Sequence, residues 1–289
     1  MKRVRLLAAL AALGVPALPA AAADAATGIA VDGQGAVYFT DGSQGSWKID
    51  NGGQVRPQEG PPANYLTLDP EGRFADARAP AGLPGFHPAG RRPTLIYSGD
   101  VPAAMGRDGA LYFPQPGADG RLRIVRQLPS GSHSVLATLP ATSESGPLES
   151  INGIAVGPDG AVYYTENRAV RRIGPEGTLA TLATSLEVPD CARPPGADEK
   201  LGPQLRGIDV APDGAVYVAA AGCGATIKVS GAGEVTPVLR TSAPWTPKSV
   251  AARERDLYVL ETSGDAAAPR VRRLSGDGRV SLLAENPRR

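Results

Sequence analysis

The sequence contains few histidines, cysteines and aromatic residues, and these scarcities argue against several kinds of site. Its 289 residues include two His, two Cys and only 5% aromatics. Two distant histidines, His87 and His133, and two thiols do not provide the ligand spacing of a zinc site. His87 and His133 are also the only histidines available to a Ser-His-Asp triad. The scarcity of histidine, together with the lack of a phosphate-cradling glycine motif, also disfavours haem and nucleotide chemistry.

Strong charge and long apolar runs are also scarce. The formal net charge is +1, and removal of the basic residues Lys2, Arg3 and Arg5 leaves a mature net charge of −2. Nucleic-acid binding requires a strongly basic field, so we expect no nucleic-acid partner. The short apolar run 6–15 follows those basic residues and precedes small residues, which is typical of a secretory signal peptide at 1–23. A retained membrane anchor is the alternative, but the run is too short to span a bilayer.

Glycine and proline, by contrast, are abundant. The chain has 36 Gly and 28 Pro, with short apolar runs between them. This composition favours many short strands joined by tight turns, in one domain at 24–289. We expect this mature domain to be a monomer that is not inserted in a membrane and lies in the periplasm or the extracellular medium.

One unit recurs six times along the chain. Its copies share an apolar stretch, a turn and a second apolar stretch, and they occupy 28–41, 66–77, 103–115, 153–166, 207–220 and 249–261. Successive copies are spaced like the blades of a propeller, and the second copy is the most degenerate.

The fourth copy shows how the unit folds. Gly153–Val156 suits a buried inner strand, and the turn 157–160 has Pro and Gly where a tight turn requires them. The stretch 161–165 is rich in β-forming residues, and two further strands are expected at 168–173 and 178–183. The sequence therefore predicts an all-β fold, a six-bladed β-propeller of four-stranded antiparallel blades. An open solenoid is the alternative, but polar capping repeats are lacking.

The repeated string Gly-Pro-Asp-Gly-Ala-Val-Tyr resembles the NHL-repeat and senescence-marker-protein (gluconolactonase-like) propellers, over essentially the whole mature chain. Secreted bacterial members are the most similar. The resemblance implies the fold strongly and the activity weakly, since this superfamily contains lactonases, lyases, synthases and binding modules.

Two rings of positions are expected to line the top of the central channel. One ring begins the inner strands, and the other ends the second strands. The polar members that we expect to bind a ligand are Asn64, Asn152, Arg206, Asp41, Glu166 and Glu261. The alternative is that these side chains only hydrogen-bond the loop backbone, as polar residues at strand ends often do. Trp47 and Trp245 are the first candidates for an aromatic lining.

The two cysteines are expected to pair. Cys191 lies in the long loop before the fifth repeat, and Cys223 lies in a loop of that repeat, so both belong to the top face. In an oxidising compartment such a pair favours a disulfide, and closing this loop would contribute roughly 3.5 kcal/mol.

The resemblance also suggests a metal-dependent activity. Gluconolactonase-like enzymes hold a divalent cation with one Glu, two Asn and one Asp at the channel top. Asn152-Gly153 matches one Asn position, whereas Thr27 and Arg206 stand at the Glu and Asp positions. A fixed positive charge at Arg206 would repel a cation. A divalent cation such as calcium would therefore need an oxygen-ligand site rebuilt around Asn152 from Asp41, Glu166 and Glu261.

Other activities of the superfamily match less well. Virginiamycin B lyase relies on a histidine, and peptide-amidating lyases need several zinc-binding histidines. Strictosidine-synthase-like propellers use one Glu, a role open to Glu166 or Glu261. The first hypothesis is therefore a non-catalytic exported propeller that binds a small molecule, glycan or peptide at its channel top. The second is a hydrolase or lyase acting on a lactone, ester or sugar acid with an altered metal site.

Overall fold

The computed structural model describes residues 28–41, 45–58, 65–67, 96–98, 102–140, 151–184, 186–193, 202–263 and 268–287. Within these ranges the regular structure is β-strand, apart from one 3₁₀ turn at Ala221–Cys223 (η2). The expected signal peptide at 1–23 and most of the second repeat lie outside the described residues. No helix in the described part of the chain is long and apolar enough to cross a membrane.

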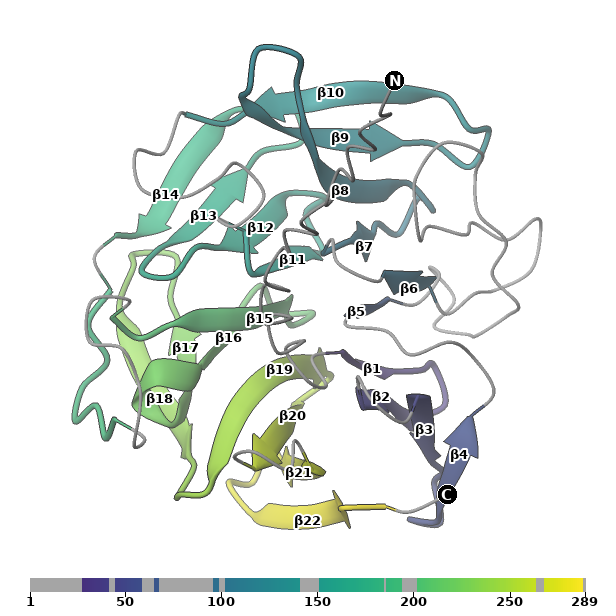
Figure 1. Ribbon diagram of the computed structural model, residues 1–289, viewed down its shortest axis with the longest axis vertical. Helices are drawn as coiled ribbons and strands as arrows, with labels where there is room; N and C mark the ends of the chain where they lie inside the picture. Colours follow the sequence, from purple (N-terminus) through teal and green to yellow (C-terminus); the bar gives the residue numbers. More distant parts are fainter. Residues whose placement is uncertain are drawn as a thin grey trace, which may run out of the picture.

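Five four-stranded antiparallel sheets are each built from one consecutive stretch of chain (Figure 1). Blade 1 contains β1 (Ile29–Val31), β2 (Val37–Asp41), β3 (Gly45–Ile49) and β4 (Val55–Gln58). Blade 3 contains β7 (Ala104–Met105), β8 (Leu111–Pro116), β9 (Leu122–Gln127) and β10 (His133–Thr138). Blade 4 contains β11 (Gly153–Val156), β12 (Val162–Thr165), β13 (Val170–Ile173) and β14 (Leu179–Ala183).

The remaining sheets complete the set. Blade 5 contains β15 (Leu205–Val210), β16 (Val216–Ala220), β17 (Ala225–Val229) and β18 (Val235–Arg240). Blade 6 contains β19 (Trp245–Arg253), β20 (Asp256–Ser263), β21 (Ala268–Leu274) and β22 (Val280–Glu285). The described part of blade 2 is the antiparallel pair β5 (Tyr65–Thr67) and β6 (Ile96–Ser98). In the sequence, β6 follows the Pro- and Gly-rich stretch 78–92.

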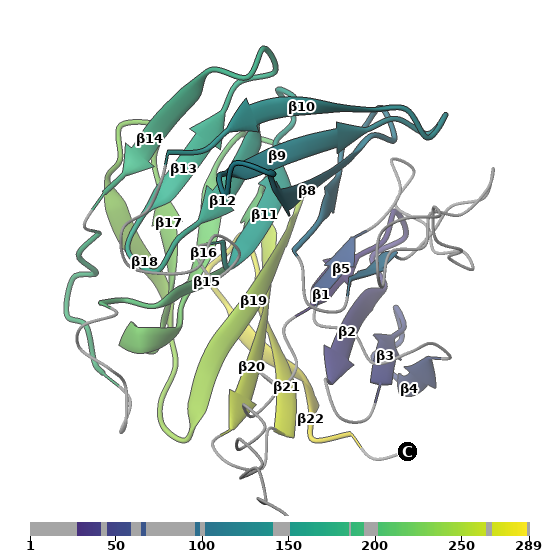
Figure 2. The same cartoon turned by 45° about the horizontal axis from the view of Figure 1, so that its top comes forward.

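The inner strands form a closed ring. Each contacts the inner strand of the next blade, in the order β1, β5, β7, β11, β15, β19 and back to β1. Figure 1 shows them around the centre of the molecule, and the turned view in Figure 2 shows the other strands of each blade lying outside them. The predicted six-bladed propeller is confirmed, and in the part of the chain that the structure describes no strand is shared between the first and last blades.

Apolar packing joins the last blade to the first. Phe39 and Trp47 of blade 1 share one buried cluster with Tyr258 and Leu260 of blade 6. Between the turns that join the first and second strands of these blades, the guanidinium of Arg253 donates a hydrogen bond to the carbonyl oxygen of Gly33 at 2.6 Å. Among the described residues, a shared core and this long-range hydrogen bond hold the first and last blades together.

The turns between first and second strands follow the sequence expectation. Gly160 has φ +76°, and the carboxylate of Asp159 accepts a hydrogen bond from the N–H of Ala161 at 3.1 Å. Gly35, Gly109 and Gly214 occupy the same place with positive φ. The Asp fixes the turn backbone, and Gly supplies the conformation that other residues resist.

A tyrosine on the second strand faces a cation on the third strand in all five four-stranded blades. These cross-strand pairs are Tyr38–Lys48, Tyr112–Arg126, Tyr163–Arg172, Tyr217–Lys228 and Tyr258–Arg273. In three blades the arginine also binds the carboxylate of an aspartate at the turn between the first and second strands, Asp108, Asp159 or Asp256. Burial acts to raise the pKa of Asp159, but hydrogen bonds from Arg172 and the Ala161 N–H outweigh it and hold the pKa below its usual value.

Arginines recur in three triplets in or just before the third strands, at 121–126, 168–172 and 270–273. One arginine of each triplet lies opposite the tyrosine in the strand pairing and forms an ion pair with the turn aspartate, while its side chain stays about a third exposed. Further members bind Asp119, Glu166 and Glu261. The triplets therefore contribute ion pairs within the blades.

Outer strands carry one extra residue each in blades 3 to 6. The pairing register shifts at Leu136, Leu182, Val238 and Leu283. Such bulges increase the local twist of a strand. In blade 4 the turn residue Gly177 lies so close to the carbonyl oxygen of Leu136 in blade 3 that a Cβ atom there would overlap it.

We expect Gly177→Ala to destabilise the fold more than Gly278→Ala. Both glycines have φ near +85°, so both substitutions incur the backbone strain of roughly 1–2 kcal/mol. Only Gly177 is packed against another blade, whereas Gly278 has open space, so the overlap adds about 1–3 kcal/mol. Urea denaturation of the two variants measures the difference, and equal losses would show that the contact between blades is absent.

Candidate functional site

The predicted residues of the channel top separate into three clusters. The first surrounds Asn152, which lies just before β11. Its side-chain amide donates hydrogen bonds to Oδ1 of Asn167 at 2.9 Å and to the carbonyl oxygen of Leu205 at 2.8 Å. The hydroxyl of Thr165 donates to the carbonyl oxygen of Arg206 at 2.6 Å. Asn152 and Arg206 are thus brought together, with Asn152 bound to the backbone beside Arg206.

Glycines explain why blades 4 and 5 approach so closely here. A Cβ atom on Gly153 would lie 2.8 Å from the carbonyl oxygen of Arg206 and 3.1 Å from Cα of Gly207. A Cβ atom on Gly207 would lie 2.6 Å from the hydroxyl of Ser249 in blade 6. Only glycine permits this backbone contact, and it places Gly153 of β11, Gly207 of β15 and Ser249 of β19 side by side.

Sequence reasoning missed Thr165 and Asn167, which flank the predicted Glu166. The hydroxyl of Thr165 binds the carbonyl oxygen of Arg206, and Oδ1 of Asn167 accepts a hydrogen bond from the side-chain amide of Asn152. The alternation of side chains along β12, which ends at Thr165, could have indicated Thr165, whereas Asn167 lies beyond the strand and no such pattern points to it.

The second cluster contains Glu166 itself. Its carboxylate accepts hydrogen bonds from Nε and Nη2 of Arg171 at 3.2 and 3.1 Å, and Arg171 also donates to the hydroxyl of Thr181. The Glu166 side chain is 21% exposed. Its charge is therefore matched within blade 4 by the third strand.

The third cluster surrounds Glu261, whose side chain is fully buried. Its carboxylate accepts hydrogen bonds from Nε of Arg270 at 2.5 Å, Nε of Arg272 at 2.9 Å and the hydroxyl of Thr241 at 2.5 Å. Nη2 of Arg272 also binds Glu261 and donates to the carbonyl oxygen of Arg240 at 2.9 Å. This network joins blade 6 to the end of blade 5, and it leaves Glu261 no exposed surface.

We expect Glu261→Gln to lower the free energy of unfolding by about 3–5 kcal/mol, because it leaves two largely buried guanidinium groups without their carboxylate. The matched change Glu166→Gln removes a more exposed pair and should cost about 1 kcal/mol or less. Urea denaturation at pH 7 compares the two variants. Similar losses would show that the Glu261 network does not stabilise the join between blades.

Two predicted site residues receive no account from the structure. Asn64 lies outside the described residues, and Asp41 ends β2 with a side chain that is not described.

The two tryptophans that were candidates for an aromatic lining lie in different surroundings. Trp47 is buried in the core between blades 1 and 6, so it cannot line a binding surface. Trp245 is half-buried, and the guanidinium of Arg270 lies 4.2 Å from the centroid of its ring.

Asp209 of β15 is a titratable group that sequence reasoning missed. One carboxylate oxygen accepts the N–H of Ala252 in β19 at 2.7 Å, and the other accepts the N–H of Val210 at 2.8 Å. Asp209 therefore links the inner strands of blades 5 and 6. Burial raises its pKa to about 6, although these two hydrogen bonds act to lower it.

This raised pKa gives stability a defined pH dependence. The folded protein holds a proton on Asp209 up to about pH 6, whereas the usual value is 3.8. The contribution of Asp209 to the free energy of unfolding is therefore greatest below pH 4 and falls as the pH rises to 6. The free energy of unfolding of the native protein, relative to that of Asp209→Asn, should fall by at most about 3 kcal/mol from pH 4 to pH 7. Urea denaturation of both proteins across this range tests it, and a constant difference would contradict the assignment.

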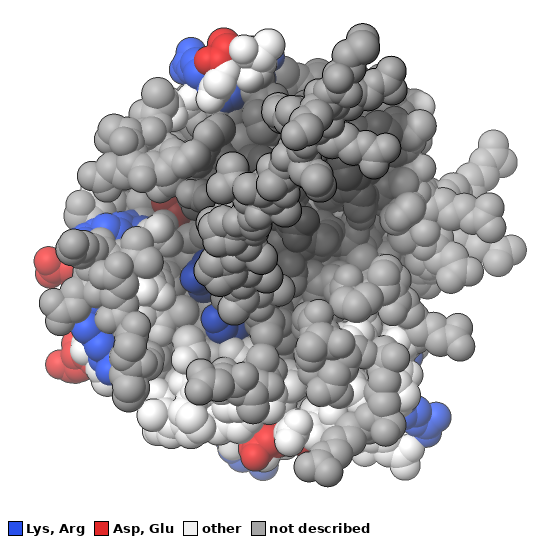
Figure 3. Space-filling model, in the orientation of Figure 1, with Lys and Arg blue, Asp and Glu red and all other residues white. Residues whose placement is uncertain are grey.

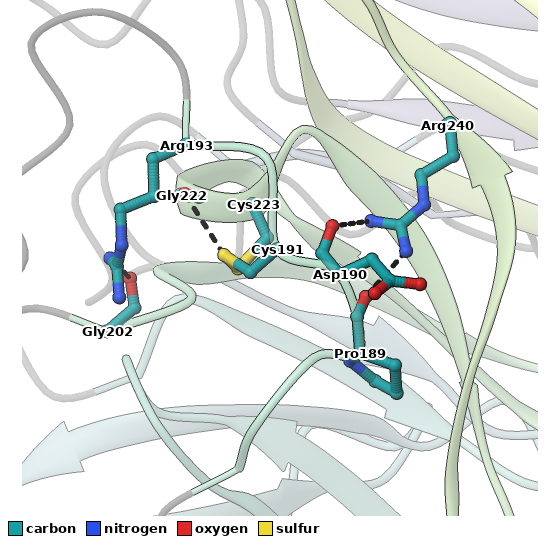
Figure 4. The surroundings of a disulfide bond; sticks show 8 residues. All are labelled: Pro189, Asp190, Cys191, Arg193, Gly202, Gly222, Cys223 and Arg240. Carbon is teal, nitrogen blue, oxygen red and sulfur yellow. Dashed lines mark hydrogen bonds between the residues drawn. A yellow bond between two sulfur atoms is a disulfide. The ribbon is translucent and has the colours of Figure 1, made fainter.

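The predicted disulfide is confirmed. Cys191 and Cys223 are bonded, and Cys223 belongs to η2 between β16 and β17 (Figure 4). Arg240 donates hydrogen bonds to the carbonyl oxygens of Pro189 and Asp190, and Arg193 donates to that of Gly202. The loop before blade 5 is thereby fixed on the top of that blade.

The metal-binding reading finds limited support in these side chains. Within the described residues, no group of three or more His, Cys, Asp or Glu side chains is placed to hold a metal ion. Glu166 and Glu261, which a rebuilt oxygen-ligand site would need, are bound to arginines. Asn152 alone keeps a position of the gluconolactonase-like set, so the described residues do not fit the group.

Comparison with known proteins agrees with the fold. No protein-family model matches the sequence, and no curated protein matches it. Among solved structures, a catalytically inactive histidine-to-alanine variant of virginiamycin B lyase from Staphylococcus aureus, with quinupristin, is similar with a TM-score of 0.53. It is 20% identical, over 92% of this chain and 86% of that one.

Regucalcin from Agrobacterium tumefaciens, a calcium-binding protein, is similar with a TM-score of 0.52 and 14% identity, over 82% of each chain. A streptogramin B lyase has a TM-score of 0.53 and 17% identity, over 92% of this chain and 84% of that one. The chain has the β-propeller fold of these proteins. At such identities the similarity establishes the fold and leaves the activity open.

Proposed function

We propose that this chain is an exported β-propeller that binds a small molecule, glycan or peptide at the top of its central channel without catalysing a reaction on it. The observation that carries the proposal is the state of the acidic groups. Glu166 and Glu261 are bound by arginines, so neither is placed to act as a base, an acid or a metal ligand. Hydrogen bonds from Asn152 and Thr165 to backbone carbonyl oxygens of β15 fix the backbone at the channel top.

Export is supported by the signal-peptide pattern at 1–23 and by the disulfide between Cys191 and Cys223. The near-neutral mature charge supports a partner other than nucleic acid. We propose that the mature chain is a monomer.

A metal-dependent hydrolase or lyase acting on a lactone, ester or sugar acid is the second candidate. It is favoured by Asn152-Gly153, the one position shared with the gluconolactonase-like cation site, and by the calcium-binding protein among the similar structures. Arg206 at the place of an acidic ligand opposes it, because its charge is permanent.

Thermal unfolding of residues 24–289 distinguishes the two candidates. Calcium, magnesium, manganese and zinc are each added, and hydrolysis of gluconolactone is followed with a pH indicator. An ion at about 100 times its Kd would add roughly 2.7 kcal/mol of stability. We expect no such ion effect and no hydrolysis above buffer, while a library of sugar acids, oligosaccharides and peptides yields a ligand that raises the Tm.

The controls use two asparagines on opposite faces. Asn152→Ala should abolish the effect of the ligand, whereas Asn51→Ala, in a bottom turn of blade 1, should leave it unchanged. An ion effect that disappears in Asn152→Ala would establish the metal-dependent candidate. If neither ions nor any library member binds, the proposed function is wrong.

A further inference from the structure

A polar hollow of about 450 Å³ lies at the end of blade 1 opposite the channel top. It is bordered by the turn at 32–36, between β1 and β2, and by the turn at 50–54, between β3 and β4, in the blade at the lower right of Figure 1. Each of these turns follows a strand that runs away from the channel top, so the hollow is separate from the site proposed above. Its polar side chains are those of Gln34, Lys48, Asp50, Asn51, Gln54 and Arg56.

Cross-strand pairing builds one wall of the hollow. Lys48 pairs with Tyr38 on one side and with Arg56 on the other, so the three side chains lie in a row on one face of blade 1. The ammonium of Lys48 lies 5.0 Å from the centroid of the Tyr38 ring, and Arg56 donates a hydrogen bond to Oε1 of Gln54 at 2.6 Å. Both cations are thus held in position by neighbours while they border the hollow.

Hydrogen bonds fix the two turns that form the other walls. Oδ1 of Asp32 accepts two N–H groups of its own turn, both at 2.9 Å, and Oδ1 of Asp50 accepts two of its turn at 2.9 and 3.0 Å. The side-chain amide of Asn51 donates to the carbonyl oxygen of Gln34 at 2.9 Å and joins one turn to the other. The walls are therefore ordered without a ligand, which reduces the entropy lost on binding.

The chemistry of the lining favours a ligand with many hydroxyl groups. Apart from Gly52, Ala36 is the one residue of the lining without a polar side chain, so an apolar ligand would bury little apolar surface. Two cations and one carboxylate border the hollow, which disfavours a metal cation. The three amide side chains each donate and accept hydrogen bonds, as the hydroxyl groups of a sugar do.

Charge over the wider surface adds no preference for one sign. Figure 3 shows positive and negative side chains close together at several places around the rim of the drawn face. The formal net charge of the whole chain is +1. In such mixed surroundings local hydrogen bonds, rather than long-range attraction, determine which ligand binds.

We infer that this hollow binds a sugar unit of a glycan, as a second site that is independent of the channel top. The amides of Gln34, Asn51 and Gln54 bind hydroxyl groups of the sugar, and Lys48 and Arg56 donate further hydrogen bonds. The volume lies within the range of about 300–1,000 Å³ that small-molecule sites occupy. The three amide residues are exposed, so a single sugar binds weakly and a longer glycan adds contacts at the rim.

Nuclear magnetic resonance titration of isotope-labelled residues 24–289 tests the inference. The probes are glucose, mannose, N-acetylglucosamine, cellotriose and maltotriose, with phosphate and sulfate as anions without a sugar. We expect at least one sugar to shift the side-chain amide resonances of Gln34, Asn51 and Gln54. Gln34→Ala and Gln54→Ala should each weaken that binding about three- to tenfold, because each removes a hydrogen-bonding group. Each variant also identifies the resonance that it removes.

Thr178→Ala is the matched control. Thr178 is exposed and holds the place of Gln54 in blade 4, since its carbonyl oxygen accepts the N–H of Gly174 as that of Gln54 accepts the N–H of Asp50. Its substitution should leave sugar binding unchanged. The second site is wrong if no sugar shifts the amide resonances, if phosphate or sulfate shifts them and no sugar does, or if both glutamine variants bind as the native protein does.

Asn152→Ala separates this site from the proposed function. It should abolish binding at the channel top and leave the sugar-induced shifts of Gln34 and Gln54 unchanged. Shifts that disappear in Asn152→Ala would show that the hollow is not an independent site. A ligand that binds through Asn152 without affecting the hollow would leave the proposed function standing whatever the sugars do.

Discussion

Backbone contact between neighbouring inner strands constrains the rest of the molecule. Gly153 touches Arg206 and Gly207, and Gly207 touches Ser249, so three blades meet with almost no side-chain volume between them. Large side chains at these levels would separate the blades and open the ring. Bulky polar residues are therefore accommodated where the strands become irregular, and the bulges of β15 and β19 supply such places. The geometry of the ring thus determines where a polar site can form.

Charge is organised by the same constraint. Acidic side chains at the ends of the second strands face arginines of the third strands, so Glu166 and Glu261 are neutralised inside their own blades or at the joins between them. A buried carboxylate needs such partners, since its desolvation would otherwise be prohibitive. The consequence for function is that neither Glu166 nor Glu261 presents an unpaired carboxylate at the channel top.

The sequence was most informative where a local rule acts without reference to other blades. The turn at 157–160 could be predicted because Pro and Gly restrict φ within four residues, and the Cys191–Cys223 bond could be predicted because both residues fall in loops of one face. Glu261 was expected at the channel top, but its burial depends on two arginines brought opposite by the pairing of β20 with β21. The role of Asp209 depends on an N–H group in another blade. No pattern within one repeat contains that information.

Asn152 shows how one position can serve two functions on this scaffold. In the gluconolactonase-like proteins that the sequence resembles, the equivalent asparagine belongs to a cation site. Here its amide nitrogen binds the carbonyl oxygen of Leu205 and thereby fixes the bulge that carries Arg206. A buried carbonyl without a donor would be costly, so this hydrogen bond gives Asn152 a structural role that requires no metal. Because this hydrogen bond runs from the residue before β11 to a carbonyl oxygen of β15, Asn152 stabilises the join between blades 4 and 5 whether or not a ligand is bound.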